Sequence, residues 1–293
     1  MNNNLKLIDV KKSFNSFLLR RINLELVQER VMALLGPNGT GKTTTLDCIA
    51  GIMFPDSGEI EICGIKQNPN TKDWKFNFGY VSSEPIFINT MTGENFLKFV
   101  SKYYPSWNFN YMIELIEKLE FDPNVKIHKL STGNKTKLEI ITALSYQPKL
   151  LLLDEPTNAL DPIIRDRFIE IIFDYMNNEE NSVIWSTHII NEVSEIADEF
   201  AFLNNGELFE ISSKVDLTEN WRRIIIPARN EITDIPDLID YENVDGKMEI
   251  ISSNYDNTFN YLNNNNIEIF DEYYINIETI AIKNLERYKK EIY

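Results

Sequence analysis

The chain has 293 residues, of which 43% are hydrophobic, and its formal net charge at pH 7 is −16; this length fits one large globular domain or two ordinary ones. Because nucleic acids are bound by clustered Lys and Arg, the acidic balance argues against nucleic acid as a partner. No apolar run approaches the roughly 18 residues of a membrane span, and the first residues lack the apolar core of a signal peptide, so the sequence predicts a cytoplasmic protein.

The first two thirds of the chain alternate between strand and helix patterns. The predicted strands are 5–10, 22–27, 30–36, 58–64, 78–81, 149–154, 182–187 and 199–204. The predicted helices are 43–53, 94–104, 111–121, 137–146, 165–176 and 189–198. This alternation predicts an α/β domain built on a parallel sheet.

The composition changes after about Ser213, where the chain becomes richer in Asn, Asp and Ile. Short strand patterns follow at 221–227, 247–252 and 266–274, and a helical pattern occupies 276–292. We therefore expect a first domain at residues 1–212 and a small α+β domain at residues 213–293. Cys48 and Cys63 lack metal-ligand spacing and are expected to be reduced thiols.

A phosphate-binding loop is predicted at Gly36–Thr44, where GPNGTGKTT matches the pattern G-x-x-x-x-G-K-[ST] between a predicted strand and a predicted helix. Glycines let backbone N–H groups converge on phosphate oxygens, and the following helix points its positive end at them. Lys42 is expected to contact the β- and γ-phosphates, and Thr43 to offer its hydroxyl to Mg²⁺. The nucleotide-binding candidates are Gly36, Asn38, Gly39, Gly41, Lys42, Thr43 and Thr44.

Two adjacent carboxylates, Asp154 and Glu155, end the apolar run LLLL. Burying such a pair is costly unless the groups are paired or used. An aspartate at a strand end beside a phosphate loop is placed to hold Mg²⁺, and Glu155 could act as the general base on the attacking water. The alternative is a helix cap before the segment PTNALDP.

Four motifs in this order, GPNGTGKTT, LSTGNK, LLLLDEPTNALDP and STH, resemble the nucleotide-binding subunit of ABC transporters. The resemblance covers about residues 5–212 and is closest to bacterial ATPases that pair with separately encoded ABC-2-type permeases, including those of bacitracin-resistance type. It implies an ABC ATPase fold, with a parallel or mixed sheet, a helical subdomain at about 85–147 and a C-terminal accessory domain. It also implies ATP and Mg²⁺ as ligands.

The resemblance assigns further roles. Ser131 and Gly133 match the signature that caps the nucleotide of a second protomer, and the predicted helix start there suits a γ-phosphate. Asn158–Asp161 matches the D-loop at the dimer interface, with Asp161 as a candidate nucleotide contact. His188 matches the switch histidine that contacts the γ-phosphate. Asn134 stands where glutamine is commonest in the family.

Aromatic and histidine positions are assigned in the same way. Phe14 matches the aromatic residue that stacks on adenine, and Phe17 is a weaker candidate; core packing is the alternative for both. His128 matches no family role and is expected to be structural.

The segment FGYVSSEP departs from the family, which commonly has G-Y-x-P-Q-E-P here. Ser83 stands where a glutamine normally senses Mg²⁺ and the attacking water. A serine keeps a hydroxyl but loses reach and the amide donor. We expect Ser83, or Glu84 beside it, to contact the metal site.

The resemblance implies ATP-driven dimerisation in which a homologous subunit or a second copy completes each ATP site. The subunit would then power an exporter and lie on the inner face of the cell membrane through its permease. Two alternatives are an ATP-sensing regulatory subunit with low turnover and a soluble ABC protein acting on ribosomes or DNA.

Overall fold

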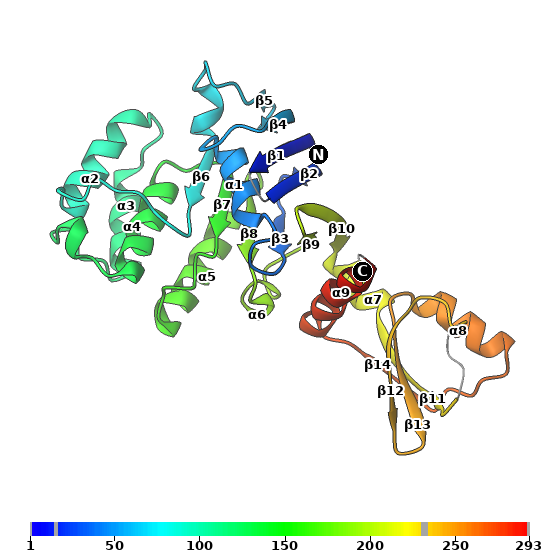
Figure 1. The fold of residues 1–293 in the computed structure, drawn as a ribbon. Coiled ribbons are helices and arrows are strands. Elements are labelled where there is room, and N and C mark those ends of the chain that lie inside the picture. The colour runs from blue at the N-terminus through cyan, green and yellow to red at the C-terminus, as the bar shows by residue number, and fades with distance from the viewer. Residues whose placement is uncertain (1, 15–16, 230–233, 292–293) are drawn as a thin grey trace.

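The structure is a computed structural model, and it describes residues 2–14, 17–229 and 234–291 (Figure 1). It contains a ten-stranded sheet with the order β5-β4-β1-β2-β10-β9-β3-β8-β7-β6. The strands of this sheet are β1 (Asn3–Phe14), β2 (Phe17–Val27), β3 (Val31–Leu35), β4 (Ser57–Ile62), β5 (Ile65–Lys66), β6 (Phe78–Val81), β7 (Leu150–Asp154), β8 (Ser182–Thr187), β9 (Glu199–Asn204) and β10 (Glu207–Ser213).

The sheet is mixed. The strands β9, β3, β8, β7 and β6 form a parallel block, as the alternation of strands and helices predicts. The pairs β1–β2, β1–β4, β4–β5 and β9–β10 are antiparallel. In the pairs β1–β2, β4–β5 and β9–β10 the two strands are consecutive in the chain with no helix between them, a connection that antiparallel pairing allows, whereas β4 reaches β1 only after β2, β3 and α1.

Helices cover both faces of the parallel block. The helices of this part of the chain are α1 (Lys42–Ala50), α2 (Gly93–Val100), α3 (Phe109–Lys118), α4 (Thr132–Ser145), α5 (Pro162–Met176) and α6 (Ile190–Val193), with short 3₁₀ turns η1 (Asp73–Phe76), η2 (Ser101–Tyr103) and η3 (Ile127–Lys129). In Figure 1, α2, α3 and α4 form the helical subdomain to one side of the sheet.

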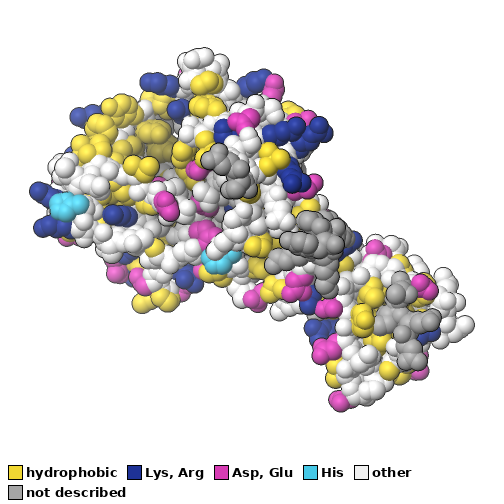
Figure 2. All heavy atoms as spheres, in the orientation of Figure 1, with side chains coloured by type: hydrophobic (Ala, Val, Ile, Leu, Met, Phe, Trp, Pro, Cys, Tyr) yellow, Lys and Arg dark blue, Asp and Glu magenta, His cyan; other side chains and the backbone are white. Residues whose placement is uncertain are grey.

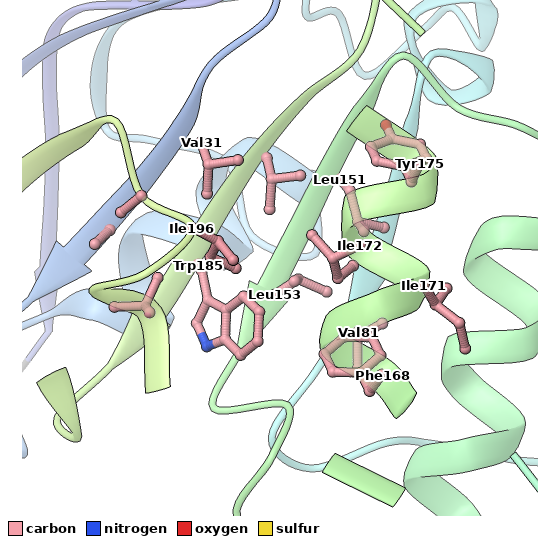
Figure 3. Packing of buried hydrophobic residues seen from close by; sticks show 14 of the residues in the cluster. Val31, Val81, Leu151, Leu153, Phe168, Ile171, Ile172, Tyr175, Trp185 and Ile196 are labelled. Carbon is pink, nitrogen blue, oxygen red and sulfur yellow. The ribbon is translucent and has the colours of Figure 1, made fainter. Parts of the chain in front are cut away.

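Successive residues of β7 serve two separate hydrophobic clusters. Leu151 and Leu153 pack with Phe168 of α5 and Trp185 of β8 (Figure 3), whereas Leu152 belongs to the cluster that contains α1. Side chains alternate across a strand, so a strand that is apolar at every position must be covered on both faces. All five residues of β7 are buried. This explains why its run of four leucines correctly predicts a strand inside the sheet.

The helix predicted at 189–198 was too long. The structure has only α6, and the chain then turns into β9. The carboxylate of Asp198 joins this turn to the start of β3: its Oδ2 accepts the N–H of Val31 at 2.9 Å, and its Oδ1 lies 3.5 Å from Nη1 of Arg30.

A second, four-stranded antiparallel sheet has the order β12-β13-β11-β14. Its elements are α7 (Lys214–Asn220), β11 (Arg222–Pro227), β12 (Leu238–Val244), β13 (Lys247–Ser252), α8 (Tyr255–Asn264), β14 (Asp271–Tyr274) and α9 (Ile277–Glu291). The side chains of Ile224, Ile250 and Leu262 join β11, β13 and α8 in a small core of their own. The strand predicted at 266–274 is shorter than expected and begins at Asp271.

Helix α9 returns from the small sheet to the first part of the chain. Ile277 and Ile280 lie in the same hydrophobic cluster as Val193 of α6 and Phe202 of β9. Asn284 is fully buried, and its Nδ2 donates to Oε2 of Glu210 in β10 at 2.7 Å. The division at residues 212 and 213 stays a prediction, since α9 packs against elements on both sides of it. Within the described ranges, no helix combines the length and the hydropathy of a membrane span.

Candidate nucleotide site

The phosphate loop connects β3 to α1 and passes very close to other backbone. A Cβ atom at Gly36 would stand 2.2 Å from the carbonyl oxygen of Leu203, so a side chain there has no space. Gly41 has a φ of 109°, a conformation that side chains disfavour, and a Cβ there would stand 2.7 Å from the ring of Phe17. Both glycines are therefore required by the path of the loop.

Lys42 begins α1 and is held by the loop that it belongs to. Its Nζ donates to the carbonyl oxygens of Gly36 at 2.8 Å and Pro37 at 3.2 Å, and it lies 3.8 Å from Oε1 of Glu155. Burial lowers the pKa of Lys42, while the charges of Glu155 and Asp154 act in the opposite direction. An ammonium placed this way can exchange the carbonyls for phosphate oxygens without leaving the loop.

Asp154 is fully buried and accepts three hydroxyl hydrogen bonds. Thr43 and Ser83 donate to its Oδ2 at 2.7 and 2.8 Å, and Ser186 donates to its Oδ1 at 2.7 Å. Hydroxyl and carboxylate oxygens are the ligands that Mg²⁺ takes in proteins. The donor set of Thr43, Asp154 and Ser83 therefore fits the predicted metal site.

Ser186 was missed in the sequence analysis. It is the penultimate residue of β8 and is in register with Asp154. Since neighbouring parallel strands end at the same edge of a sheet, its position one residue before the TH of the STH motif was the available signal.

Glu155 and His188 contact each other through their side chains. Oε2 of Glu155 lies 2.7 Å from Nδ1 of His188 and also accepts from Nδ2 of Asn158. Glu155 has a φ of 51°, which is uncommon outside glycine and costs conformational energy. Such strain occurs at functional positions, so the backbone supports the expectation that Glu155 is used in chemistry.

These residues surround one open cavity of about 680 Å³. Its lining side chains and backbone are Phe14, Phe17, Asn38, Gly39, Gly41, Lys42, Thr43, Thr44, Ser83, Glu84, Glu155, Asn158 and His188. Phe14 is 44% exposed, and Nζ of Lys12 lies over its ring, 5.9 Å from the centroid. The ring of Phe17 instead lies against Gly41, inside the lining of the loop.

The signature residues do not line this cavity. Ser131 is the N-cap of α4, where its Oγ accepts the N–H of Asn134 at 3.3 Å. A Cβ atom at Gly133 would stand 2.4 Å from the carbonyl oxygen of Ala159, so the signature packs against the D-loop. Asp161 caps α5 by accepting the N–H of Ile164 at 3.1 Å and also lies outside the cavity lining.

A buried carboxylate that the sequence analysis did not single out connects residues on either side of the D-loop to the segment after His188. Glu192 of α6 accepts the hydroxyl of Thr157 and lies 3.0 Å from Nη1 of Arg165. Its side chain is only 4% exposed. His128, in contrast, lies at the surface with its Nδ1 3.1 Å from the carbonyl oxygen of Asn89, a structural contact remote from the cavity lining.

Comparison with known proteins assigns this arrangement to a family. A family model described as "ABC transporter" matches residues 19–158. The chain is 31% identical over 209 residues to the bacitracin transport ATP-binding protein BcrA of Bacillus licheniformis, an alignment that covers 70% of this chain and 68% of BcrA. The chain belongs to the ABC transporter ATP-binding proteins.

Two further similarities agree with this assignment. The ABC ATPase is 29% identical over 208 residues to the ABC transporter ATP-binding protein YtrB of Bacillus subtilis (strain 168), covering 70% of each chain. Its fold is similar to the dimeric post-hydrolysis structure of the ATP-binding cassette MJ0796 bound to ADP and Pi, with a TM-score of 0.64 and 24% identity over 72% of this chain and 98% of that one. The predicted ABC ATPase fold is thus confirmed. The chain is an ATP-binding subunit that hydrolyses ATP to power transport.

Proposed function

We propose that this ABC ATPase drives an exporter by closing with a second nucleotide-binding subunit around ATP, while it is bound to a separately encoded ABC-2-type permease. The observation that carries the proposal is an incomplete site. Lys42, Glu155 and His188 line one cavity, whereas Ser131 lies outside its lining. The buried Asp154 is hydrogen-bonded to two lining residues, Thr43 and Ser83. A second subunit, which is either another copy or a homologue, would supply the missing signature.

Each side chain has a distinct task in this proposal. Lys42 binds the β- and γ-phosphates, and Thr43, Asp154 and Ser83 would hold Mg²⁺, which supplies charge neutralisation to the phosphates. Glu155 accepts the proton of the attacking water. His188, 2.7 Å from Glu155, orients that carboxylate and contacts the γ-phosphate. Phe14 stacks on the adenine.

The direction of transport is proposed from the relatives. BcrA is named for bacitracin transport, and the motifs of this chain resemble those of stand-alone ATPases that pair with exporter permeases. The structure of MJ0796 is of a dimer, which supports dimerisation as the step that ATP drives.

An exposed hydrophobic surface supports the permease as partner. Figure 2 shows hydrophobic side chains gathered over the helical subdomain. Ile86, three residues after Ser83, is 96% exposed, and Tyr103 and Phe109 are more than half exposed. Large apolar groups at a surface are typical of a protein–protein contact. The proposed place of the subunit is therefore the inner face of the membrane, held there by this contact.

Loss of turnover in one variant tests the catalytic part of the proposal. Glu155→Gln keeps the size of the side chain but removes its basicity, so ATP hydrolysis should fall by roughly 10²-fold or more, while ATP binding is retained. Glu180→Gln is the control, because Glu180 is exposed beside Lys149 and lines a different pocket. Wild-type protein without turnover would favour the ATP-sensing regulatory alternative.

The partner is tested by purification from membranes. The tagged chain should co-purify with a polytopic membrane protein, and Ile86→Asp should weaken that association without changing ATP affinity. Co-purification with ribosomes instead would favour the soluble ABC alternative and contradict the exporter proposal.

The task of Ser83 is tested by restoring the family residue. If the side chain at this position senses the metal, Ser83→Gln should raise the ATPase rate or change its dependence on Mg²⁺ concentration. An unchanged rate together with an unchanged Mg²⁺ dependence would show that the side chain at position 83 does not act on the site.

A further inference from the structure

Helix α4 carries a carboxyl group that points into the protein. Glu139 lies in the third turn of the helix, between Leu138 and Ile140, both of which are fully buried. Its Oε2 is buried and has no hydrogen-bond partner among the described residues. No lysine or arginine is among the groups that perturb this carboxyl.

The groups that do face Glu139 belong to the turn after β6 and to the metal site. Helix α4 packs against β6, since Val81 at the end of that strand lies in the same hydrophobic cluster as Leu138 and Ile140. The backbone N–H of Ser82, the next residue, and the charge of Asp154 both act on the pKa of the carboxyl. The next residue after Ser82 is Ser83, whose hydroxyl donates to Oδ2 of Asp154 at 2.8 Å. A single short turn therefore joins Glu139 to the candidate Mg²⁺ ligand.

Stability alone does not account for a carboxyl group at this place. A buried polar atom without a partner destabilises the folded state, and an apolar side chain of similar volume would remove that cost. Burial raises the pKa of Glu139 to about 8, with Asp154 acting in the same direction and the N–H of Ser82 opposing it. The uncharged form of the group is thus accessible near neutral pH, and it retains a carbonyl acceptor for Ser82.

We propose that Glu139 is a positioning residue for ATP hydrolysis, which holds the Ser82–Ser83 turn against α4 and so keeps the hydroxyl of Ser83 on Asp154. This inference rests on the proposed role of Asp154 and Ser83 at the metal. Helix α4 begins at Ser131, the residue proposed to cap the nucleotide of the second subunit. Through helix α4, Glu139 therefore connects two parts of the proposed dimer. One is the signature, which contacts the ATP of the second subunit, and the other is the metal ligand at the ATP of its own subunit.

The key variant is Glu139→Leu, which removes the acceptor and the unpaired oxygen together. We expect its melting temperature to rise, while kcat falls roughly tenfold or more because a displaced turn misplaces reacting groups. The KM for ATP should stay unchanged, and a higher Mg²⁺ concentration should be needed for half-maximal rate. A rise in stability with a fall in rate cannot come from misfolding.

Two companion variants make the assignment specific. Glu139→Gln keeps an acceptor for Ser82 and should recover most of the wild-type kcat. Glu117→Leu, an exposed glutamate of α3 in the same subdomain, is the matched control and should leave both kcat and Mg²⁺ dependence unchanged. A Glu139→Gln enzyme as slow as Glu139→Leu would overturn the role of the acceptor.

A double-mutant cycle with Ser83 tests the route of the effect. If Glu139 acts through Ser83, then adding Glu139→Leu to Ser83→Ala should lower kcat no further. Additive losses would overturn the proposal, as would a Glu139→Leu variant with wild-type kcat and Mg²⁺ dependence, or one whose stability and activity both fall. Absence of turnover in the wild type would overturn the proposed function as well, whereas an active wild type with an unaffected Glu139→Leu would overturn this inference alone.

Discussion

The two sheets of the molecule expose their strands to very different degrees. Every residue of β7 and β8 is buried, whereas every residue of β14 is exposed and none of β12 is fully buried. When other elements pack on both faces of a sheet, a polar side chain at the end of a strand is shielded from water and held in a fixed position. A sheet that is covered on one face presents its other side chains to water, where charges are screened.

The polar groups of the two sheets reflect this difference. At the ends of β7 and β8, Asp154 and Ser186 are fully buried and bonded to each other. On the small sheet, Arg223 pairs with Glu249, and Lys283 of α9 pairs with Asp240 of β12, all partly exposed. The comparison indicates that the buried polar groups of the candidate site belong to the ten-stranded sheet.

The largest effect should come from removing the buried cation of the large sheet. Lys42→Met should weaken ATP binding by roughly 100-fold, because removing one partner of a buried, hydrogen-bonded charge typically costs about 2–5 kcal/mol. The small sheet offers a matched control: Arg222 is also buried and stacks on Tyr274, 3.5 Å from its ring centroid. Nucleotide titration of Arg222→Met should give wild-type affinity. A large loss there would contradict the separation of roles.

A second test creates a cavity by mutation in the core of each sheet and compares the effects. Leu152 in β7 and Ile250 in β13 are both fully buried, and truncation of either to alanine should cost about 2–5 kcal/mol of folding free energy. Leu152→Ala should also lower ATP affinity, since its strand carries Asp154. Ile250→Ala should lower only the unfolding temperature of the small sheet in calorimetry. Equal loss of ATP affinity in both variants would show that the two cores are one cooperative unit.

The same contrast explains which elements could be predicted from the sequence. Strands β3 and β7 are apolar at nearly every position, and the motifs at their ends locate the phosphate loop and the two carboxylates. The segment of β12, LIDYENV, has no continuous apolar face, since its first three residues are partly buried and its last four are exposed. No pattern therefore marked it as a strand. Helix α8 contains four asparagines, a composition typical of turns, and it is stabilised by burial of Leu262 in the small core.

Parts of the candidate site could not be predicted for a different reason. Glu139 lies in the run KLEIITALS, where a glutamate looks like one of the polar positions of an amphipathic helix. Only the packing of α4 against the end of β6 places it inside the protein. Glu192 was equally inconspicuous, because its partners Thr157 and Arg165 come from a distant part of the chain.

A third prediction uses the pH dependence of stability. The pKa of Glu139 is raised from 4.5 to about 8 in the folded protein, so between these values the folded state binds more protons than the unfolded state and stability falls as pH rises. Glu139→Gln lacks this proton. The free energy of unfolding of the variant, relative to wild type, should therefore increase by about 1–3 kcal/mol from pH 5 to pH 8. A constant difference across this range in urea titrations would contradict burial of the carboxyl. Glu180→Gln, at an exposed site, should show no such trend.

The smallest effect should come from removing an exposed ion pair of the small sheet. Arg223 and Glu249 lie opposite the α8 side, with Nη1 2.9 Å from Oε2, and their side chains are 44% and 27% exposed. Because exposed pairs gain little Coulomb energy and restrict two long side chains, a double-mutant cycle of Arg223→Ala and Glu249→Ala should give a coupling of about 0.2–1 kcal/mol. The ATPase rate should be unchanged in all three variants. A coupling of several kcal/mol, or a changed rate, would mean that this face is packed against another surface in the working protein and takes part in its cycle.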